Sequence, residues 1–516
     1  MTNAVQNIWR HADATPGHIA LREGDRTWTY AELRACVGRA AVELTRRGVR
    51  RGDRVLMVVP TSAEFIFTYH GVLSLGATAV TVNTLSTPRE IEYFLTDADC
   101  ALAIGYHETQ DALVTATSAV TRPTWILEPG SLAADMPQRD DERALYLDVD
   151  ETDAAVLLYT SGTTGKPKGA VLTHANLLAS AEALSKVQGI GADDRIATAL
   201  PLFHVYGQAS VMGSVQHVGG SLSLVRRFEA AAMLELAAAH RLTAIAGVPT
   251  MWNAMLHAET SVTVADISPL RLCMSGGAPL PTPVSNAFRA RFGARIIDGY
   301  GLTETTGAAA AVSLPHEPKA GSVGRAVPGT SIAILDLDHQ PVPLGQVGEV
   351  AIDGPGVMRE YWKRPEATAN VRSGSWFLTG DLGRMDTDGD LWIVGRLKEL
   401  IIRGGYNVYP AEVEDVIYSH PAVLECAVIG IPDERLGEEV AAVLMLQQGQ
   451  SLDLGELREW LAERLAAYKV PRVYQVSDTL PKGTTGKILK RDIDHEDVLH
   501  NGLRPRRAAM TPTANE

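Results

Sequence analysis

A loop rich in glycine, threonine and lysine constrains this chain most. Residues 159–169 read YTSGTTGKPKG, and they follow an apolar stretch, Ala154 to Leu158, that predicts a short buried strand. Glycine permits the φ values of a tight concave loop, so the backbone N–H groups of such a loop can turn inward around an anion. Its hydroxyl groups add donors, and its two lysines add positive charge. The pattern therefore predicts a polyphosphate-binding loop at the end of a strand.

This loop differs from the Walker A sequence of P-loop ATPases. That sequence has four residues between its glycines and a Ser or Thr directly after the lysine. Here Gly162 and Gly165 are two residues apart, and Pro167 follows Lys166. A P-loop ATPase is therefore disfavoured. The alternative without a ligand is a flexible surface turn.

Length and composition exclude several classes of protein. A chain of 516 residues is too long for one hydrophobic core and predicts several folding units. Its net charge of −14 argues against a nucleic-acid binder, which normally has a basic excess. No stretch reaches the length of a membrane span and the first residues are polar, so we expect a cytoplasmic protein. The four cysteines have no CxxC spacing, which predicts reduced thiols that serve packing.

Alternating apolar runs and helix-like segments predict an α/β fold. Between Ile8 and Gly247, runs such as Arg54 to Pro60 precede helix-like segments such as Ser62 to Gly76. This alternation is typical of βαβ units and mainly parallel sheets. From Gly321 to Asp390 the runs become short and β-like, with Gly and Pro between them, which predicts a small β subdomain.

The last hundred residues or so predict a second, smaller domain. Helices are expected over Pro410 to Ser419 and over Leu454 to Leu465, with strands near Cys426 and Val440, which is a compact α+β unit of ordinary domain size. We predict domains at residues 1–395 and 396–500. Residues 501–516 have few large apolar side chains and are expected to be disordered.

Several strings occur in an order that resembles one enzyme family. The string Gly-Thr-Thr-Gly-Lys occurs at residues 162–166 and again at 483–487, and DGYGLTE occupies residues 298–304. Together with the loops at 275–278 and 379–381, these strings resemble the motifs of the acyl-adenylate-forming (AMP-binding) enzymes, which include acyl-CoA synthetases, adenylation domains and luciferases. The resemblance covers the chain from about Trp28 to Lys490. It is greatest to fatty acyl-CoA ligases of bacterial type.

This resemblance implies an ATP-dependent ligase. A carboxylic acid, expected to be a fatty acid, would attack ATP to give an acyl-adenylate and pyrophosphate, with Mg²⁺ on the phosphates. The acyl group would then pass to the thiol of CoA with release of AMP. Two alternatives stay open: an acyl-AMP ligase that loads the phosphopantetheine of an acyl carrier protein, and a nucleotide-binding regulator that has lost catalysis.

The resemblance also implies catalytic roles for individual residues. Lys487 would bridge the substrate carboxylate and the α-phosphate, where a positive charge stabilises the charge that develops during attack. Tyr300 would stack on adenine, and Thr303 would contact phosphate. Glu304 would hold Mg²⁺ together with Thr163, because this hard cation binds one or two carboxylates and keeps several waters.

Nucleotide binding would involve a larger set of residues. Asp381 and Arg396 resemble the pair that binds ribose, since an ionised carboxylate has two acceptor oxygens. The residues implied in ATP or AMP binding are Thr160, Ser161, Gly162, Thr163, Thr164, Gly165, Lys166, Lys168, Ser275, Gly276, Gly277, Ala278, Asp298, Gly299, Tyr300, Gly301, Asp381 and Arg396.

Two half-reactions in two domain arrangements are implied as well. Lys398 aligns with the hinge position of the family, and a hinge needs only a few residues that absorb a change in φ and ψ. After adenylation the C-terminal domain would rotate, so that Gly404, Gly405 and Tyr406 line the channel through which the thiol enters.

His204 is implied as a further catalytic residue at the start of the acid pocket, near the carboxylate, where it would steer the acyl group or gate access of the thiol. Amino-acid-activating relatives carry an Asp in the motif that here reads Pro201-Leu-Phe-His204, and a buried ammonium without a partner is costly. We therefore expect an acid without an α-amino group. The expected pocket residues are small or apolar, which suits an aliphatic chain; they are Tyr206, Gly207, Val248, Met251, Met274, Gly307 and Ala308.

Overall fold

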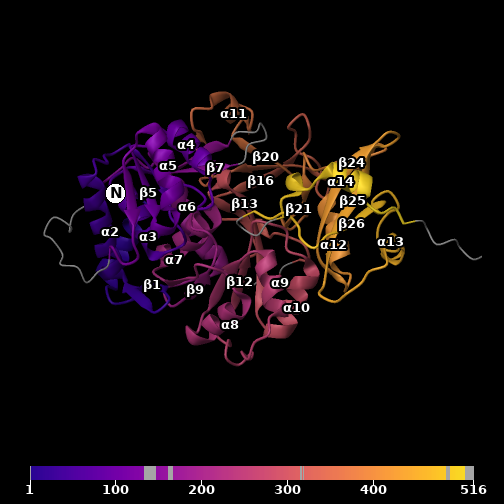
Figure 1. Ribbon diagram of the computed structural model, residues 1–516, viewed down its shortest axis with the longest axis horizontal. Helices are drawn as coiled ribbons and strands as arrows, with labels where there is room; N and C mark the ends of the chain where they lie inside the picture. Colours follow the sequence, from indigo (N-terminus) through magenta and orange to yellow (C-terminus); the bar gives the residue numbers. More distant parts are fainter. Residues whose placement is uncertain are drawn as a thin grey trace, which may run out of the picture.

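A computed structural model describes residues 2–132, 147–160, 167–313, 316–317, 319–483 and 488–505. The strands of these residues form four sheets, and helices cover the two larger ones (Figure 1). The arrangement confirms the predicted α/β class, with mainly parallel sheets in the large N-terminal part and a smaller α+β part after them. None of the helices in the described ranges is both long and apolar enough to cross a bilayer.

The first large sheet carries the predicted phosphate loop. Its order is β18-β8-β7-β4-β3-β5-β6, and the pairs from β7 to β6 are parallel. Its strands are β3 (Arg54–Val58), β4 (Thr78–Thr81), β5 (Leu102–Tyr106), β6 (Thr124–Leu127), β7 (Ala154–Thr160), β8 (Lys168–Thr173) and β18 (Glu360–Tyr361). The predicted apolar strand before the loop is therefore β7.

The second large sheet carries the DGYGLTE string. Its order is β15-β14-β13-β12-β11-β9-β10-β1-β2, parallel from β13 to β1 and antiparallel at both edges. Its strands are β1 (Ile19–Glu23), β2 (Arg26–Thr29), β9 (Arg195–Thr198), β10 (Ser221–Leu224), β11 (Ala244–Gly247), β12 (Leu272–Ser275), β13 (Arg295–Leu302), β14 (Gly307–Ala311) and β15 (Arg325–Ala326).

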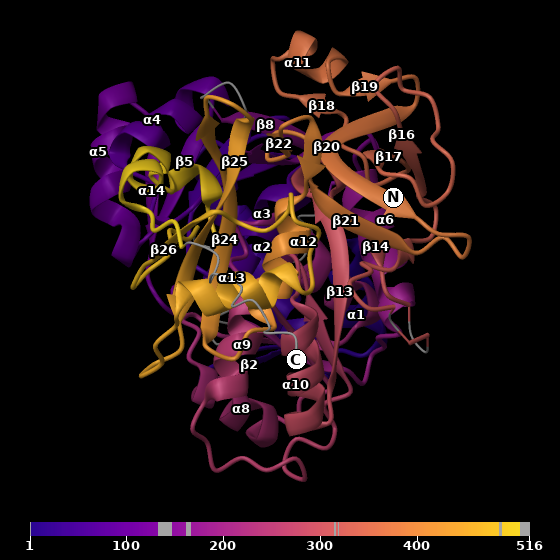
Figure 2. The same cartoon turned by 90° about the vertical axis from the view of Figure 1, so that its right-hand side faces the viewer.

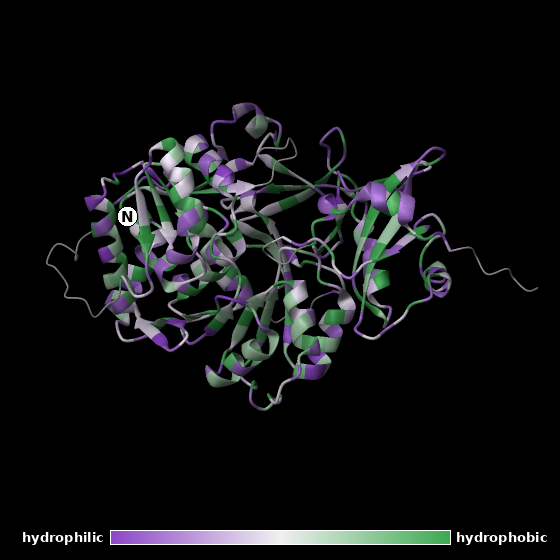
Figure 3. Cartoon of the chain, viewed as in Figure 1, coloured by the Kyte–Doolittle hydropathy of each residue, from purple (hydrophilic) through white to green (hydrophobic). Residues whose placement is uncertain are grey.

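The helices of this part differ in how deeply they are buried. All residues of α3 (Ala63–Ser74) are buried, which fits its mostly apolar sequence. Its N-terminus is fixed by Ser62, whose hydroxyl accepts a hydrogen bond from the Phe65 N–H at 3.2 Å. The outer helices show mixed hydrophobic and hydrophilic residues (Figure 3). The remaining helices here are α1 (Gln6–Ala14), α2 (Tyr30–Arg46), α4 (Pro88–Asp97), α5 (Gln110–Val120), α6 (His174–Gln188), α7 (Ser214–Val218), α8 (Ala230–Ala239), α9 (Pro249–His257) and α10 (Thr282–Phe292).

Two short helical segments interrupt this pattern near the predicted motifs. Residues Tyr206–Gly213 form a π-helix, η3, directly after the Pro201–His204 motif. Residues Thr303–Thr305 form a 3₁₀ turn, η4, between β13 and β14. π-Helices are rare and occur frequently at functional sites.

A small β subdomain and the C-terminal part complete the chain (Figure 2). The subdomain contains β16 (Ser331–Leu335), β17 (Gly348–Asp353), β19 (Arg372–Ser373), β20 (Trp376–Met385) and β21 (Leu391–Arg396), with α11 (Pro365–Ala369) nearby. The C-terminal part contains β22 (Ile401–Arg403), β23 (Tyr406–Val408), β24 (Val423–Asp433), β25 (Gly437–Leu446) and β26 (Val473–Val476), with α12 (Pro410–Tyr418), α13 (Leu454–Ala462), the 3₁₀ turn η5 (Lys490–Asp492) and α14 (His495–Asn501).

The predicted elements of the C-terminal part match closely. The helix expected over Pro410 to Ser419 is α12, and the one expected to reach Leu465 is α13, which ends three residues earlier at Ala462. The domain boundary at 395/396 stays a prediction: β21 still pairs with β20 up to Arg396, whereas β22 pairs with the C-terminal sheet. Most of the predicted tail, residues 506–516, lies outside the described residues.

Candidate active site

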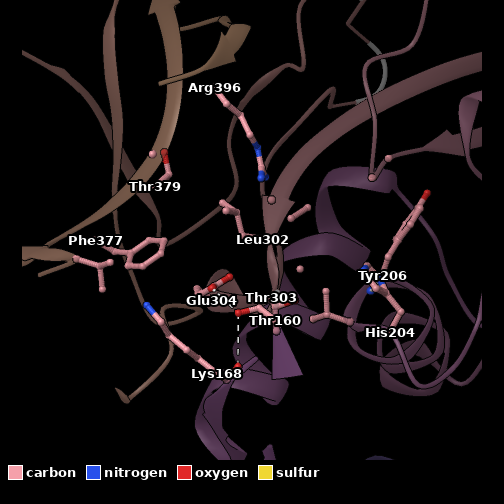
Figure 4. Close-up of a pocket in the computed structure, with 18 of the residues that line it drawn as sticks. Thr160, Lys168, His204, Tyr206, Leu302, Thr303, Glu304, Phe377, Thr379 and Arg396 are labelled. Atoms are coloured by element: carbon pink, nitrogen blue, oxygen red, sulfur yellow. Dashed lines mark hydrogen bonds between the residues drawn. The ribbon is translucent and has the colours of Figure 1, made fainter. Parts of the chain in front are cut away.

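One large cavity brings many of the predicted residues together. It has a volume of about 1530 Å³ and is lined by the ends of β7, β8, β12 and β13, by β14, by the β subdomain and by residues 488–491 of the C-terminal part. Pockets for one small ligand usually measure about 300 to 1,000 Å³. The cavity therefore has room for a nucleotide and an acid side by side. Figure 4 shows Thr160, Thr303 and Glu304 close together at its centre.

The two strands beside the phosphate loop end at the cavity. Thr160 closes β7 and Lys168 opens β8, and both line the cavity. The Thr160 hydroxyl lies 3.3 Å from Glu304 Oε1 and 3.5 Å from the Lys168 carbonyl oxygen. The loop between them, with the predicted ligands Ser161, Gly162, Thr163, Thr164, Gly165 and Lys166, lies outside the described residues, so the roles of these six stay predictions.

Glu304 is held by a tyrosine that the sequence analysis missed. Glu304 lies in η4 with 8 % of its surface exposed, and Tyr361 donates a hydrogen bond of 2.7 Å to its Oε1. β18 pairs with β8, which places Tyr361 opposite Ala170 and so beside the phosphate loop. Burial and the neighbouring carboxylate of Glu304 raise the pKa of Tyr361, so its hydroxyl stays protonated and donates.

The carboxylate of Glu304 has an oxygen left for a cation. Its Oε1 accepts hydrogen bonds from the hydroxyl groups of Tyr361 and Thr160, whereas Oε2 makes no hydrogen bond with any residue in the described ranges. Mg²⁺ commonly binds through one or two carboxylates and the phosphates of its substrate. The geometry at Glu304 therefore fits a single-carboxylate Mg²⁺ site, and Thr303 lines the cavity beside it.

Arg396 lines the cavity, whereas its neighbour Asp381 and Tyr300, which contacts Asp381, do not belong to the lining. The Tyr300 hydroxyl donates to Asp381 Oδ2 at 2.7 Å, and Arg396 Nε lies 3.0 Å from Oδ1. Asp381 and Arg396 are neighbours because the antiparallel pairing of β20 with β21 places them opposite each other. Each carboxylate oxygen has a further lone pair, but Asp381 is 4 % exposed and outside the cavity lining, so its contact with ribose hydroxyls stays a prediction. Stacking of Tyr300 on adenine stays a prediction.

The predicted adenine loop follows β12. Ser275, Gly276 and Gly277 line the cavity, whereas Ala278 does not belong to its lining. β12 and β13 are parallel and pair Ser275 with Asp298, so both strands deliver their ends to one edge. Gly299 and Gly301 of β13 also line the cavity.

Asp298 has an unusual charge state at this edge. Burial raises its pKa to about 7, although hydrogen bonds from the backbone N–H groups of Gly299 and Leu280 lower it in part. The carboxyl group is therefore protonated in a large share of molecules near neutral pH.

The π-helix η3 shapes the predicted acid pocket. His204 lines the cavity just before η3, and its Nδ1 accepts from the Tyr206 N–H at 3.3 Å. The Tyr206 hydroxyl donates to the Met274 carbonyl at 2.8 Å, and both residues line the cavity. Gly307 and Ala308 face them from β14. A methyl group at Gly307 would lie 2.1 Å from Ser210 Oγ, and its φ of +100° also favours glycine.

The other predicted pocket residues lie elsewhere. Gly207, Val248 and Met251 do not belong to the lining of the cavity. Gly207 packs against the Pro201 carbonyl, where a methyl group would approach to 2.6 Å, and Val248 and Met251 belong to the hydrophobic core. The wall is instead completed by residues that the sequence analysis did not name, namely Leu184, Gln188, Val205, Ser210, Ile297 and Ala311.

The C-terminal part contributes a short segment to the lining of the cavity. Lys487 lies outside the described residues, but the residues that follow it, 488–491, line the cavity, as do Lys398 and Glu399. Lys490 Nζ lies 2.7 Å from Glu414 Oε1 and 3.7 Å from Glu399 Oε2. Burial alone would lower the pKa of Lys490, but these two carboxylates outweigh burial and raise it.

The predicted thiol channel points away in this arrangement. Gly404 and Gly405 have φ of +57° and +84° and form the turn between β22 and β23, and Tyr406 stacks on Tyr468 with ring centres 4.9 Å apart. None of the three predicted residues lines the cavity. In this structure residues 488–491 of the C-terminal part, rather than the β22–β23 turn, therefore face the residues that are predicted to bind the nucleotide.

Comparison with known protein families identifies the family of this chain. The model of the AMP-binding enzyme family matches residues 8–362, and that of the AMP-binding enzyme C-terminal domain matches residues 412–487. The chain belongs to the AMP-binding enzyme family. This match confirms the predicted membership among the acyl-adenylate-forming enzymes.

Relatives of this AMP-binding enzyme cover almost its full length. It is 38 % identical over 496 residues to a feruloyl-CoA synthase of Amycolatopsis, covering 96 % of this chain and 99 % of that protein. It is 33 % identical over 524 residues to a long-chain-fatty-acid–CoA ligase of Bacillus subtilis, covering 95 % and 93 %. The crystal structure of ATP-bound MatB from Rhodopseudomonas palustris is similar with a TM-score of 0.88 at 32 % identity, covering 97 % and 98 %. The predicted class of AMP-forming acid–thiol ligase is thereby confirmed.

Proposed function

We propose that this AMP-binding enzyme joins ATP to a carboxylic acid without an α-amino group and transfers the acyl group from the adenylate to CoA. The observation that carries the proposal is the single cavity, in which the phosphate-side residues Thr160 and Glu304, the ribose-side residue Arg396 and the acid-side residue His204 share one space. Attack of a carboxylate on the α-phosphate requires that arrangement, because both substrates must be in contact.

The phosphates are bound beside Glu304. Lys168 and the N–H groups of the phosphate loop neutralise and orient the phosphate oxygens, and Glu304 Oε2 is the oxygen that would hold Mg²⁺. Bound Mg²⁺ supplies positive charge that stabilises the phosphoryl oxygens during displacement. Tyr361 keeps the carboxylate of Glu304 in position, and Asp381 with Arg396 orients the ribose.

Lys487 supplies the charge at the reacting atoms in this proposal. Its neighbours Ile488 and Leu489 line the cavity, which supports a lysine delivered from the C-terminal part. Pyrophosphate then leaves, and rotation about Lys398 exchanges this segment for the Gly404–Tyr406 turn. The thiol next attacks the acyl carbon, the acyl–oxygen bond breaks, and AMP departs with the oxygen.

The acid lies between α6, η3 and β14. Leu184, Ile297, Ala308 and Ala311 make most of that wall apolar, which favours an acid with a hydrophobic body. Among the described residues of α6, η3, β13 and β14 that line the cavity, Asp298 is the one carboxylate, and it lies at the adenine end, so an α-ammonium group would lack a dedicated partner.

CoA is the acceptor of the acyl group in this proposal, because the relatives reported above are named as CoA synthases or CoA ligases. A cytoplasmic location is part of the proposal, and four buried free cysteines are compatible with it. The test is to incubate the protein with ATP, Mg²⁺, CoA and a panel of aliphatic and aryl acids and to identify the products by mass spectrometry. Acyl-CoA supports the proposal. Acyl-AMP without acyl-CoA points to a carrier protein as acceptor, and no adenylate with any acid refutes it.

A matched pair of variants tests the role of Lys487. Lys487→Ala is expected to lower adenylation, measured as pyrophosphate release, by about a hundredfold or more, while ATP binding persists. Thioester formation from supplied acyl-adenylate should survive. Lys482→Ala is the control. Lys482 lies five positions before Lys487 in the sequence, but it pairs with Glu425 at 2.8 Å and does not line the cavity. Near-normal adenylation in Lys487→Ala contradicts the assignment.

A further inference from the structure

The acid region of the cavity has a near end and a remote end. β14 starts at Gly307, next to the phosphate-side turn η4, and runs to Ala311. α6 follows the same course, since the Ser180 hydroxyl donates to the Thr306 carbonyl at 2.8 Å while Leu184 packs in one cluster with Ala311. Gln188, the last residue of α6, therefore lies at the remote end. From Ser180 to Gln188 the helix advances by about 12 Å.

Two polar side chains stand in this mostly apolar region without protein partners. Gln188 lines the cavity with 7 % of its surface exposed, and its Oε1 is buried and makes no hydrogen bond within the described ranges. Ser210 also lines the cavity, with 4 % exposed, and its hydroxyl makes no hydrogen bond to the residues that the structure describes. Buried polar groups are nearly always hydrogen-bonded, and one left without a partner costs free energy.

The two groups stand at different depths. Ser210 Oγ lies opposite Gly307, within 2.1 Å of where a β-carbon of that residue would be. Gln188 lies beyond Ala311, at the end of the wall. A purely hydrocarbon acid that filled the region would leave the Gln188 amide unpaired, whereas an acid with a hydroxyl at its far end would satisfy it.

We propose that the remote end of the acid region is a polar subsite, in which Gln188 accepts a hydrogen bond from a hydroxyl group on the far part of the acid. The substrate class is thus a hydroxy acid with an apolar middle. Rotation of the Gln188 side-chain amide turns Oε1 toward the hydroxyl, and Ser210 is available to a polar group nearer the carboxylate. This inference rests on the proposed function and adds the chemistry of the substrate to it.

Matched pairs of acids distinguish a hydroxyl group on an aryl ring from one at the end of an aliphatic chain. The aryl pair is 3-phenylpropionate and 3-(4-hydroxyphenyl)propionate, and the aliphatic pair is decanoate and 10-hydroxydecanoate. A site built to hydrogen-bond a substrate hydroxyl discriminates strongly against an analogue that lacks it. We expect the hydroxylated member of at least one pair to have a kcat/KM about tenfold higher or more. The pair that responds identifies the source.

Gln188→Met tests whether the glutamine causes this preference. Methionine has nearly the same shape without the amide, so the preference should fall to about twofold or less. Ser185→Ala is the control, because Ser185 is buried on the same helix, donates to the Glu182 carbonyl at 2.9 Å and does not line the cavity. It should keep the wild-type preference.

Four outcomes decide the inference. Loss of a wild-type preference in Gln188→Met supports it. Equal reaction of both members of both pairs in the wild-type protein, or a preference that survives in Gln188→Met, overturns it while the proposed function stands. Absence of any acyl-adenylate overturns both. If Gln188→Met does not fold, the wild-type comparison alone decides.

Discussion

Removal of the Tyr361 hydroxyl isolates one contact at the proposed Mg²⁺ site. Tyr361→Phe keeps the ring, which lies 5.2 Å from Lys168 Nζ, and removes only the donor that bonds Glu304 Oε1 at 2.7 Å. Glu304 then keeps a single donor on that oxygen, the Thr160 hydroxyl at 3.3 Å. The carboxylate gains freedom to rotate away from the phosphates.

The expected size of this effect follows from the charge and burial of the contact. Hydrogen bonds to charged groups contribute about 1.5 to 3 kcal/mol. Loss of a group that orients a metal ligand typically lowers metal affinity about 10- to 100-fold. We therefore expect the Mg²⁺ concentration for half-maximal adenylation to rise at least about tenfold in Tyr361→Phe, while kcat at saturating Mg²⁺ falls only a few-fold.

The assay is pyrophosphate release at fixed ATP and acid across a Mg²⁺ titration. Tyr30→Phe is the control, because the buried Tyr30 hydroxyl donates to the Gly220 carbonyl at 2.8 Å, on a strand connection away from the cavity. Both variants lose a buried hydrogen bond and some thermal stability, but only Tyr361→Phe should change the Mg²⁺ requirement. An unchanged Mg²⁺ titration in Tyr361→Phe would refute the role of this contact.

Two further predictions concern Asp298 and Gly307. The folded-state pKa of Asp298, about 7, lies above that of the unfolded chain, so ionisation opposes folding and stability falls as pH rises from about 4 through 7, by up to about 4 kcal/mol. Asp298→Asn should remove that part of the decline, which denaturant titrations at several pH values measure; an identical pH dependence would show that the carboxyl group does not titrate there. Gly307→Ala should cost about 1 to 3 kcal/mol and raise the KM of the acid but not of ATP, because the new methyl group meets Ser210 Oγ at 2.1 Å and φ is +100°. The double variant with Ser210→Ala should recover part of the acid KM, and no recovery would contradict the steric account.

Local patterns in the sequence were sufficient for the fold class and for several site residues. The apolar run before the phosphate loop is β7, and DGYGLTE begins in β13 and ends in η4, where Glu304 faces the cavity. Local motifs can predict site residues because residues that are adjacent in sequence lie together in one loop. The β-like run at Leu391 likewise became β21, which pairs Arg396 with Asp381.

Long-range contacts and side-chain direction could not be predicted in the same way. Tyr361 reaches Glu304, 57 positions away, only because β18 pairs with β8, and nothing in the string Arg359-Glu-Tyr-Trp362 indicates that pairing. Val248 and Met251 have the expected apolar character but turn into the core instead of the cavity. The sequence analysis missed Gln188 because a polar residue near a helix end is normally expected to face solvent, whereas Gln188 is buried.

β14 and α6, two of the three elements that enclose the acid region, differ in how mutation can alter them. β14 reads Gly-Ala-Ala-Ala-Ala, so almost every substitution on it can only take space away, and Gly307 has no room for any side chain. α6 presents Leu184 and Gln188, which can become either smaller or larger without disturbing a strand pairing. Of these two elements, the helix is therefore the one on which a substitution can more readily lengthen the accepted acid.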